Sequence, residues 1–204
     1  MMEHYIFVHG RKVELTKAQA DELWQRFGPE DVKLCDVSVS DTFRIGEREF
    51  VVLEQFEDSA AVILKDLLHE SMDFGRNNRL DGSDVDKACG EFANEIAGMV
   101  GEENLVEFAV DLTSDDGLKD YGMIKRKMSP LTADQYRKYV EILDQHKIEK
   151  WQWLATPHST KRHENDSWVK CVSPSGYLNV GYYGLGRNGV RPFCILKSHI
   201  FVSV

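Results

Sequence analysis

The sequence predicts an α+β fold with two central helices and a strand-rich C-terminal third, preceded by a small N-terminal hairpin-helix appendage. Short apolar runs bounded by Gly, Asn and Asp indicate hairpins ahead of the first long helix. Two longer segments, 83–100 and 132–143, carry apolar residues at helical spacing. With 204 residues, of which 42% are hydrophobic, the chain can bury one sizeable core. We therefore expect an appendage over 1–40 and a main domain over 41–204, joined near Val37–Ser40.

The first forty residues predict a short hairpin followed by a helix. Tyr5–Val8 and Lys12–Leu15 lie on either side of a glycine, as the strands of a hairpin do. Thr16 and Gln19 have the spacing of a capping box, which predicts the start of a helix. The apolar stripe of that helix consists of Leu23, Trp24 and Phe27. The unit is either a docking appendage or a small subdomain that packs on the core.

A second hairpin, a further strand and a helix are predicted to open the main domain. Thr42–Ile45 and Glu49–Gln55 flank a Gly-Glu turn, and Ala60–Leu68 is a strongly apolar run. Ser83 and Asp86 then have the spacing of a helix cap. The apolar face of the helix that follows carries Val85, Cys89, Phe92, Ile96 and Val100.

The acidic residues of 81–86 also suggest a calcium loop, because they alternate as calcium ligands do. An EF-hand loop ends on a bidentate Glu, and Phe92 or Ala93 stands at that position instead. The helix cap is therefore the favoured interpretation.

The middle of the chain predicts a strand, a turn and a second long helix. Glu107–Leu112 is the strand and Thr113–Gly117 the turn. Thr132 and Gln135 form another capping box. The inner face of the helix that it begins carries Tyr136, Tyr139, Val140 and Leu143.

The C-terminal stretch joins two rigid, aromatic-rich ends through a polar middle. Trp151–Pro157 and Gly189–Leu196 are the ends. Between them, Ser173–Val190 holds a single charged residue, Arg187, although 29% of the whole chain is charged. The middle is rich in Tyr, Gly, Asn and Ser. Tyr offers a large contact area with few rotatable bonds and the small residues offer adaptable polar contacts, so the composition is that of a recognition surface.

Three motifs of this stretch follow one another in the order W-x-W-L-x-T-P, W-V-x-x-V-S-x-x-G-x-L and G-V-R-P. Over residues 41–204 the chain resembles proteins of the C-type-lectin fold in its formylglycine-generating-enzyme-like branch. Within that branch it is most similar to the variable proteins of diversity-generating retroelements and their undiversified relatives. The resemblance implies a C-type-lectin-like fold. Its specific motifs are those in residues 151–196, since the helical matches are ordinary amphipathic patterns.

In such retroelements a reverse transcriptase copies a template with errors at adenines, so Asn codons drift to codons that cannot encode Lys, Glu, Gln, Trp or Met. Residues 177–188 contain none of these five types. A glycine-rich surface loop without diversification would show the same absence. The resemblance implies a surface that binds a protein or a glycan, formed by Tyr177, Asn179, Tyr182, Tyr183, Leu185, Arg187 and Asn188.

Three residues around this surface are predicted to support it. Trp153 and Trp168 lie on alternating strand patterns, so we expect both to fill the core. Arg191 stands at the entry to a strand, just before a proline. We expect its guanidinium to lock the base of the loop by pairing with a carboxylate or with backbone carbonyls.

Enzymatic interpretations are weaker. The enzymatic branch of the family uses two cysteines with copper to activate oxygen, and Cys171 and Cys194 are the candidates here. Both stand beside large apolar residues, which favours inert buried thiols. The four cysteines form no C-x-x-C pair, so reduced buried thiols are expected throughout. Ser173–Gly176 is not a G-x-S-x-G nucleophile elbow either. We expect no catalytic residue and no cofactor.

A metal site is likewise not expected. His158 and His163, with Glu164 and Asp166 close by, could offer ligands from a single loop. Their spacing matches no standard zinc pattern, and the surrounding residues are those of a solvated loop.

Charge and hydropathy restrict the partners. The net charge of −9 argues against nucleic acid, although Trp151–Val204 alone carries six basic and two acidic residues. No apolar run is long enough for membrane insertion, and Met1–Gly10 lacks the pattern of a secretory signal. We expect a protein of the cytoplasm or of a phage particle assembled there. An undiversified interaction domain, with a structural or regulatory role, is the alternative, and an oxidase-like enzyme is the third choice. The oligomeric state stays open.

Overall fold

The computed structural model describes residues 4–8, 11–19, 22 and 31–204. In the N-terminal segment, β1 (His4–Val8) and β2 (Arg11–Leu15) form the predicted antiparallel hairpin. Thr16 and Gln19 make both hydrogen bonds of the predicted capping box. The apolar stripe predicted for the helix that follows, Leu23, Trp24 and Phe27, lies outside the described residues.

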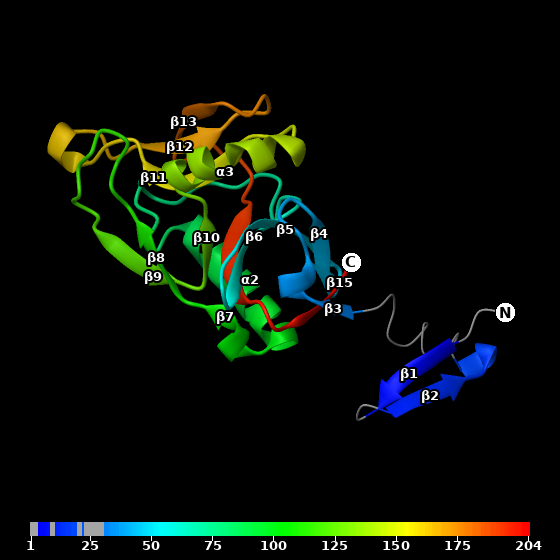
Figure 1. The fold of residues 1–204 in the computed structure, drawn as a ribbon. Coiled ribbons are helices and arrows are strands. Elements are labelled where there is room, and N and C mark those ends of the chain that lie inside the picture. The colour runs from blue at the N-terminus through cyan, green and yellow to red at the C-terminus, as the bar shows by residue number, and fades with distance from the viewer. Residues whose placement is uncertain (1–3, 9–10, 20–21, 23–30) are drawn as a thin grey trace.

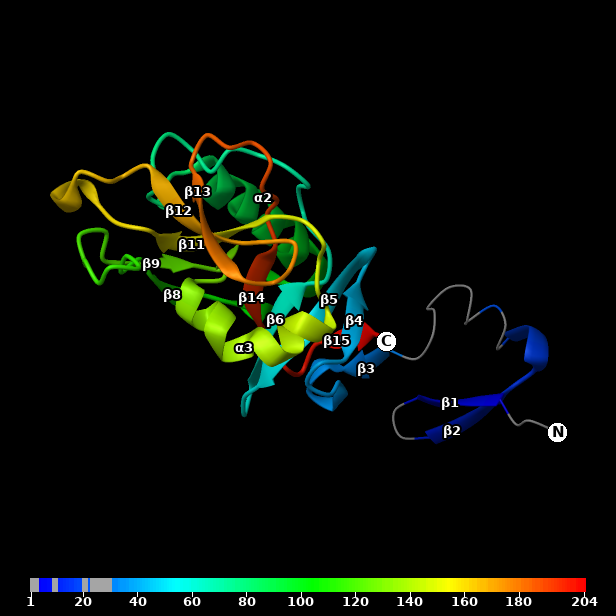
Figure 2. The same ribbon diagram turned by 90° about the horizontal axis from the view of Figure 1, so that it is seen from above.

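An eight-stranded antiparallel sheet forms the centre of the main body (Figure 1). Its path runs β10-β14-β6-β5-β4-β15-β3, and β7 pairs with one end of β14. The sheet curls into a half-barrel (Figure 2). Its strands are β3 (Asp31–Lys33), β4 (Thr42–Ile45), β5 (Arg48–Gln55), β6 (Ser59–Leu64), β7 (Leu105–Val106), β10 (Met128–Pro130), β14 (Pro192–Lys197) and β15 (Phe201–Ser203).

The central strands β5 and β6 are buried on both faces of the sheet, because a helix covers each face there. Phe50 and Val52 belong to the core that contains the inner face of α2 (Asp84–Val100). Val51, which lies between them, packs in a second core with α3 (Ala133–Gln145). A strand buried on both sides needs a continuous apolar run rather than an alternating one, and the sequence of β5 meets that requirement.

Both long helices begin at the predicted caps. The Ser83 hydroxyl accepts a hydrogen bond of 3.0 Å from the backbone N–H of Asp86. Thr132 and Gln135 exchange the two hydrogen bonds of a capping box. Each cap satisfies N–H groups that the helix itself leaves unpaired, and contributes about 1 kcal/mol to stability. The two long helices and the mixed α+β class are thus confirmed.

Two smaller sheets lie beside the main one. A three-stranded antiparallel sheet contains β11 (Gln152–Pro157), β12 (Trp168–Val172) and β13 (Leu178–Tyr182). A two-stranded sheet contains β8 (Phe108–Asp111) and β9 (Met123–Arg126). Short 3-10 turns cover Leu34–Asp36, Glu102–Asn104 and Lys161–His163.

The structure differs from the predicted boundaries at two places. β3 pairs with β15, and Leu34 is fully buried in the core, so the main sheet already includes residues ahead of the boundary expected at residue 40. The strand predicted over Ala60–Leu68 ends earlier, at Leu64. It ends there because the carbonyls of Leu64 and Lys65 accept hydrogen bonds from the buried guanidinium of Arg191.

Candidate recognition surface

The β12–β13 hairpin carries the N-terminal half of the predicted surface. Trp168 pairs with Tyr182 and Val169 pairs with Gly181. Because side chains alternate along a strand, these two pairs face opposite sides of the sheet. Val169 and Gly181 are buried, whereas Trp168 and Tyr182 are exposed to 40% and 39%. At this end of the hairpin one side therefore faces the core and the other faces solvent, whereas further along β12 Val172 is 2% exposed and packs in the core that contains α3.

The buried side is closed by Trp153. Its indole is 1% exposed, its Nε1 donates a hydrogen bond of 2.9 Å to the carbonyl of Met72, and its ring meets Phe74 edge to face at 5.5 Å. A Cβ at Gly181 would lie only 2.9 Å from the indole, so this position of β13 accepts glycine alone without rearrangement. Trp153 is thus buried in the core, where the sequence places it.

The exposed side carries a group of three rings, which we call the aromatic ledge: Trp168, Tyr182 and Tyr183. Trp168 meets Tyr182 edge to face at 6.1 Å, and Tyr182 stacks on Tyr183 at 4.4 Å. The prediction that Trp168 fills the core was wrong. The alternation of β12 puts Trp168 on the side opposite Val169, where nothing among the described residues covers it fully.

Tyr177 and Asn179 flank the ledge at the start of β13. Tyr177 is 56% exposed, as a contact residue must be. Asn179 is half-buried, and its side-chain oxygen accepts a hydrogen bond of 2.8 Å from the backbone N–H of Val180. That N–H points away from β12, on the open edge of the sheet, so Asn179 covers a backbone donor that an incoming strand would otherwise use.

The loop after β13 is anchored from below. Leu185 is half-buried against the core, and Arg187 is exposed. Asn188 was predicted to be exposed, but it is 1% exposed, which corrects that assignment. The backbone carbonyl of Asn188 accepts a hydrogen bond of 2.9 Å from the backbone N–H of Met72. Its side-chain amide has no hydrogen bond of normal geometry within the described residues. The backbone is closely packed at Gly189, where an added Cβ would lie 2.7 Å from a backbone oxygen. Asn188, which precedes this glycine, is therefore buried.

Arg191 locks the base of this loop, as predicted. It is 4% exposed, and its guanidinium donates to the carbonyls of Leu64, Lys65 and His146 at 2.8, 3.0 and 3.2 Å. Burial lowers the pKa of Arg191 to about 10, although the nearby charge of Asp66 acts in the opposite direction. Backbone carbonyls, rather than a carboxylate, thus hold the guanidinium.

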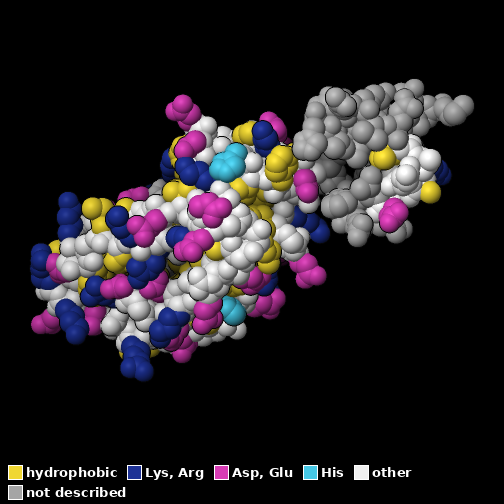
Figure 3. All heavy atoms as spheres, turned by 90° about the horizontal axis from the view of Figure 1, so that it is seen from below, with side chains coloured by type: hydrophobic (Ala, Val, Ile, Leu, Met, Phe, Trp, Pro, Cys, Tyr) yellow, Lys and Arg dark blue, Asp and Glu magenta, His cyan; other side chains and the backbone are white. Residues whose placement is uncertain are grey.

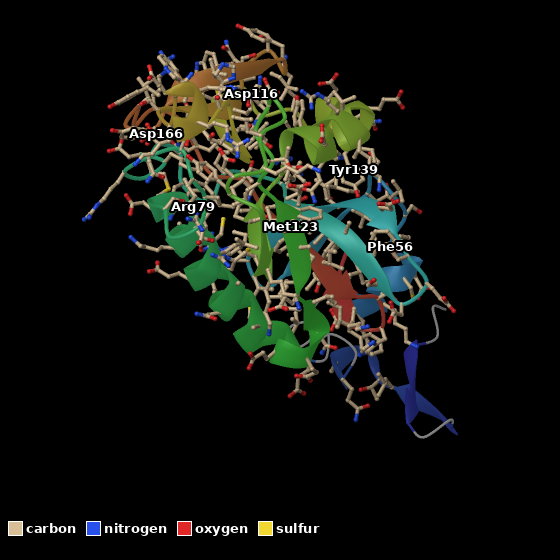
Figure 4. The ribbon with its side chains drawn as sticks, turned by 90° about the vertical axis from the view of Figure 1, so that its left-hand side faces the viewer. Phe56, Arg79, Asp116, Met123, Tyr139 and Asp166 are labelled. Carbon is tan, nitrogen blue, oxygen red and sulfur yellow. The ribbon has the colours of Figure 1, made fainter. Side chains whose placement is uncertain are left out.

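Two acidic residues that the sequence assigned to a plain turn hold the loop before β12. Asp116 accepts hydrogen bonds from Ser159 at 2.6 Å and from the His163 ring at 2.9 Å. Hydrogen bonds from Ser114 and Ser159 hold the pKa of the Asp116 carboxyl well below its usual range. Asp116 lies beside the three-stranded sheet (Figure 4).

Its neighbour Asp115 binds the Lys170 ammonium at 3.1 Å, and His158 lies 3.7 Å from the same carboxylate oxygen. The two histidines thus pair with separate aspartates instead of converging with Glu164 and Asp166. Within the described residues, no group of three or more His, Cys, Asp and Glu side chains is placed to hold a metal ion. The signal in the sequence was the adjacent Asp-Asp pair, but Ser159, His163 and Lys170, which bind it, are more than forty residues away.

The acidic loop before α2 also has an internal partner. Arg126 binds Asp86 through two nitrogens, at 2.7 and 2.8 Å, and Asp81 at 2.8 Å. Asp86 also accepts a hydrogen bond from the N–H of Gly82. Hydrogen bonding to Asp86 raises the pKa of Arg126. The carboxylates therefore serve the helix cap and an ion pair, which agrees with the cap interpretation.

The thiols follow the prediction with one exception. Cys89, Cys171 and Cys194 are buried and free, but Cys35 is exposed. Burial raises the pKa of Cys171 to about 11 and also raises the pKa of Cys194. Thiols held in the protonated form are poor nucleophiles and poor metal ligands.

Hollows lie elsewhere on the molecule. One of about 500 Å³ lies between β4, β15 and the end of α2, and another of about 310 Å³ lies beside the start of α2. Neither is lined by a predicted site residue. Figure 3 views the molecule from the side on which β15 and the end of α2 lie, where hydrophobic side chains are scattered among acidic and basic ones. The candidate surface is therefore an open one rather than a pocket.

Comparison of the chain with protein-family models, curated proteins and solved structures found no match. Within the described residues, no helix has the length and apolarity needed to cross a membrane.

Proposed function

We propose that this chain is a ligand-recognition protein that presents the aromatic ledge and its flanking loop on a C-type-lectin-like scaffold of the formylglycine-generating-enzyme-like branch. Tyr177, Tyr182, Tyr183, Leu185 and Arg187 make the contact. The ligand is a protein or a glycan. The support for the fold is the resemblance of the C-terminal motifs together with two helices packed against antiparallel sheets.

The observation that carries the proposal is the exposed contact between Tyr182 and Trp168. Contiguous exposed apolar surface on a soluble protein often marks an interaction site, and the exposed rings of Trp168 and Tyr182 meet the half-buried ring of Tyr183 on the ledge. Trp and Tyr are enriched among the residues that dominate binding energy. The reverse side of the same hairpin is fixed by Gly181 against Trp153, so the ledge is held in place before binding.

The open shape of the ledge favours a macromolecular ligand. Small-molecule sites are concave, and the two hollows of about 500 and 310 Å³ lie away from the ledge. Other exposed apolar residues, such as Phe56 and Met123, stand singly and far from it (Figure 4).

Diversification by a retroelement is part of the proposal. The fold tolerates change best at Tyr177, Tyr182 and Arg187, which are exposed. A near-copy of the codons for residues 165–190, next to a reverse-transcriptase gene, is the expected genomic arrangement. Its absence would leave the recognition surface in place and remove the diversification.

One observation favours the alternative of an undiversified interaction domain. Asn179 caps a strand edge, Asn188 is buried and Gly181 lies against Trp153, so three residues of the 177–188 window serve the fold. A window that is freely exchanged would spare such positions. The oxidase-like alternative is disfavoured by the buried thiols of Cys171 and Cys194, whose pKa values are raised.

The test is a binding screen of the full chain on a glycan array and on a displayed library of random peptides, repeated with Tyr182→Ala. Loss of a central aromatic contact costs about 2 kcal/mol or more, which corresponds to about 30-fold in affinity. Met123→Ala is the matched control, because Met123 is 72% exposed and lies away from the ledge. Ligands that bind wild type and Tyr182→Ala equally well would place the binding surface elsewhere.

A further inference from the structure

Arg187 lies over an aromatic ring in the loop that follows the ledge. Its guanidinium carbon lies 5.1 Å from the centre of the Trp151 ring, which is itself half-buried against the core. The backbone N–H of Arg187 donates to the carbonyl of Leu185 at 2.6 Å, and the N–H of Gly189 donates to the carbonyl of Trp151 at 2.7 Å. These bonds tie the loop to the same tryptophan on which the guanidinium rests.

The charge of Arg187 has no acidic partner within the described chain. Three other cations there also lie over aromatic rings, and each of them binds a carboxylate as well: Arg48 with Glu95, Arg79 with Asp81, and Lys138 with Glu54. No described carboxylate oxygen lies within 4.0 Å of the Arg187 guanidinium nitrogens. Asp73 is a nearby acid, close to Gly186, but it stays beyond that distance.

A guanidinium placed over the face of an indole is attracted by the ring and still has N–H groups to offer to an acceptor. Those N–H groups form a fork that matches a carboxylate. Contact with the Trp151 ring reduces the conformational freedom of the side chain, so less entropy is lost when a carboxylate binds.

We propose that Arg187 is the anchor for a carboxylate of a protein partner, an Asp or Glu that stands beside an apolar or aromatic side chain seated on the ledge. A protein is favoured over an acidic glycan because Trp, Tyr and Arg together are the composition of the energetic centre of protein interfaces. This inference rests on the proposed function, since it names the partner of the same surface.

The experiment selects a displayed library of random twelve-residue peptides on the full chain. Enriched peptides are resynthesised in pairs, with each Asp or Glu kept or replaced by Asn or Gln. Each pair is measured against wild type, Arg187→Gln, Arg187→Lys and Tyr182→Ala. The control is Arg48→Gln, since Arg48 also lies over a ring but already binds Glu95.

Acidic peptides with an adjacent aromatic or aliphatic residue are the expected selection. Loss of the peptide acid should weaken binding to wild type by about tenfold or more, and should cost nothing further in Arg187→Gln. The affinity of Arg187→Lys for the acidic peptides should lie between those of wild type and Arg187→Gln, because lysine keeps the positive charge but lacks the forked N–H groups of arginine. Thermal melts of Arg187→Gln should match wild type, since Arg187 is exposed.

Other outcomes separate this inference from the proposed function. Peptides without an essential acid, lost with Tyr182→Ala and unchanged with Arg187→Gln, would overturn the carboxylate anchor and leave the ledge as the binding surface. Acidic glycans that depend on Arg187, in the absence of such peptides, would overturn the protein partner. Binding that is indifferent to both Tyr182 and Arg187 would overturn the proposed function together with this inference.

Discussion

Gly181 lies directly against the indole of Trp153: a Cβ built at residue 181 would stand 2.9 Å from Cζ3 of the tryptophan. This contact joins the scaffold to the candidate surface, because Gly181 belongs to the strand whose opposite side carries Tyr182. The exposed rings are therefore supported by a backbone that cannot move closer to the core.

Gly181→Ala should destabilise the protein by about 1 to 3 kcal/mol, the usual cost of overpacking a close contact. The control is Gly90→Ala in α2, where an added Cβ meets nothing within 4 Å and helix propensity predicts a gain of about 0.5 to 1 kcal/mol. Urea unfolding of both variants measures the difference. Equal stabilities would mean that the β13 backbone can shift away from Trp153.

Replacing the two tryptophans of the hairpin region should lower the stability of the protein by very different amounts. Trp153→Ala should cost about 3 to 5 kcal/mol, because it leaves a cavity in the core. Trp168→Ala should cost no more than about 1 kcal/mol, since the side chain is 40% exposed. Thermal or urea unfolding of the two variants measures both losses of stability. A large loss for Trp168→Ala would show that its ring is part of the scaffold.

Tyr182→Ala should leave stability within about 1 kcal/mol of wild type while weakening ligand binding. Tyr182 is a cleaner probe than Tyr183, because Tyr183 packs partly against the core. The melt can be done before any ligand is known. If Tyr182→Ala unfolds as readily as Trp153→Ala, the ring is structural and recognition lies elsewhere.

The Asp116 carboxylate should make stability depend on pH in the acid range. Its folded-state pKa is depressed below the ordinary value of 3.8, so its contribution is present above that value and is lost as the pH falls through the folded-state pKa. Asp116→Asn should therefore be less stable than wild type at pH 7, and the gap should narrow below about pH 4. Urea melts at pH 7 and pH 3 measure both. If the stability difference between the two proteins did not change with pH, the hydrogen bonds from Ser114 and Ser159 would not be stabilising the ionised Asp116 carboxylate.

One thiol per chain should react quickly with an aromatic disulfide reagent in the native protein. Cys35 is exposed, whereas Cys89, Cys171 and Cys194 are buried and should react only on unfolding. Peptide mapping of the labelled chain identifies the site. Fast labelling of Cys171 would reveal an opening of the hairpin, and a native disulfide between any pair would contradict the free thiols.

Much of the fold can be read from local patterns in the chain. The caps at Ser83 and Thr132 depend on residues three positions away, so the sequence alone locates both helix starts. The hairpin of β4 and β5 is equally local, since its turn contains Gly46 at a φ of 58°. The sequence also places Trp153 in the core, because a bulky aromatic residue in an apolar run is usually buried. It predicts that Arg191 binds a carboxylate or backbone carbonyls, because a charged residue at the entry to a strand needs such partners.

Packing between distant segments settles what those patterns leave open. A strand has two faces, and the sequence of β12 does not say that both are buried from Val169 onward while Trp168, at its start, stays exposed. The register against β11 and the seat of Gly181 on Trp153 bury Val169, so Trp168 faces solvent. Local composition suggests that Asn188 is exposed, but a hydrogen bond from Met72 draws its backbone into the core. Burial depends on contacts between residues far apart in the chain, and such contacts are absent from any local pattern.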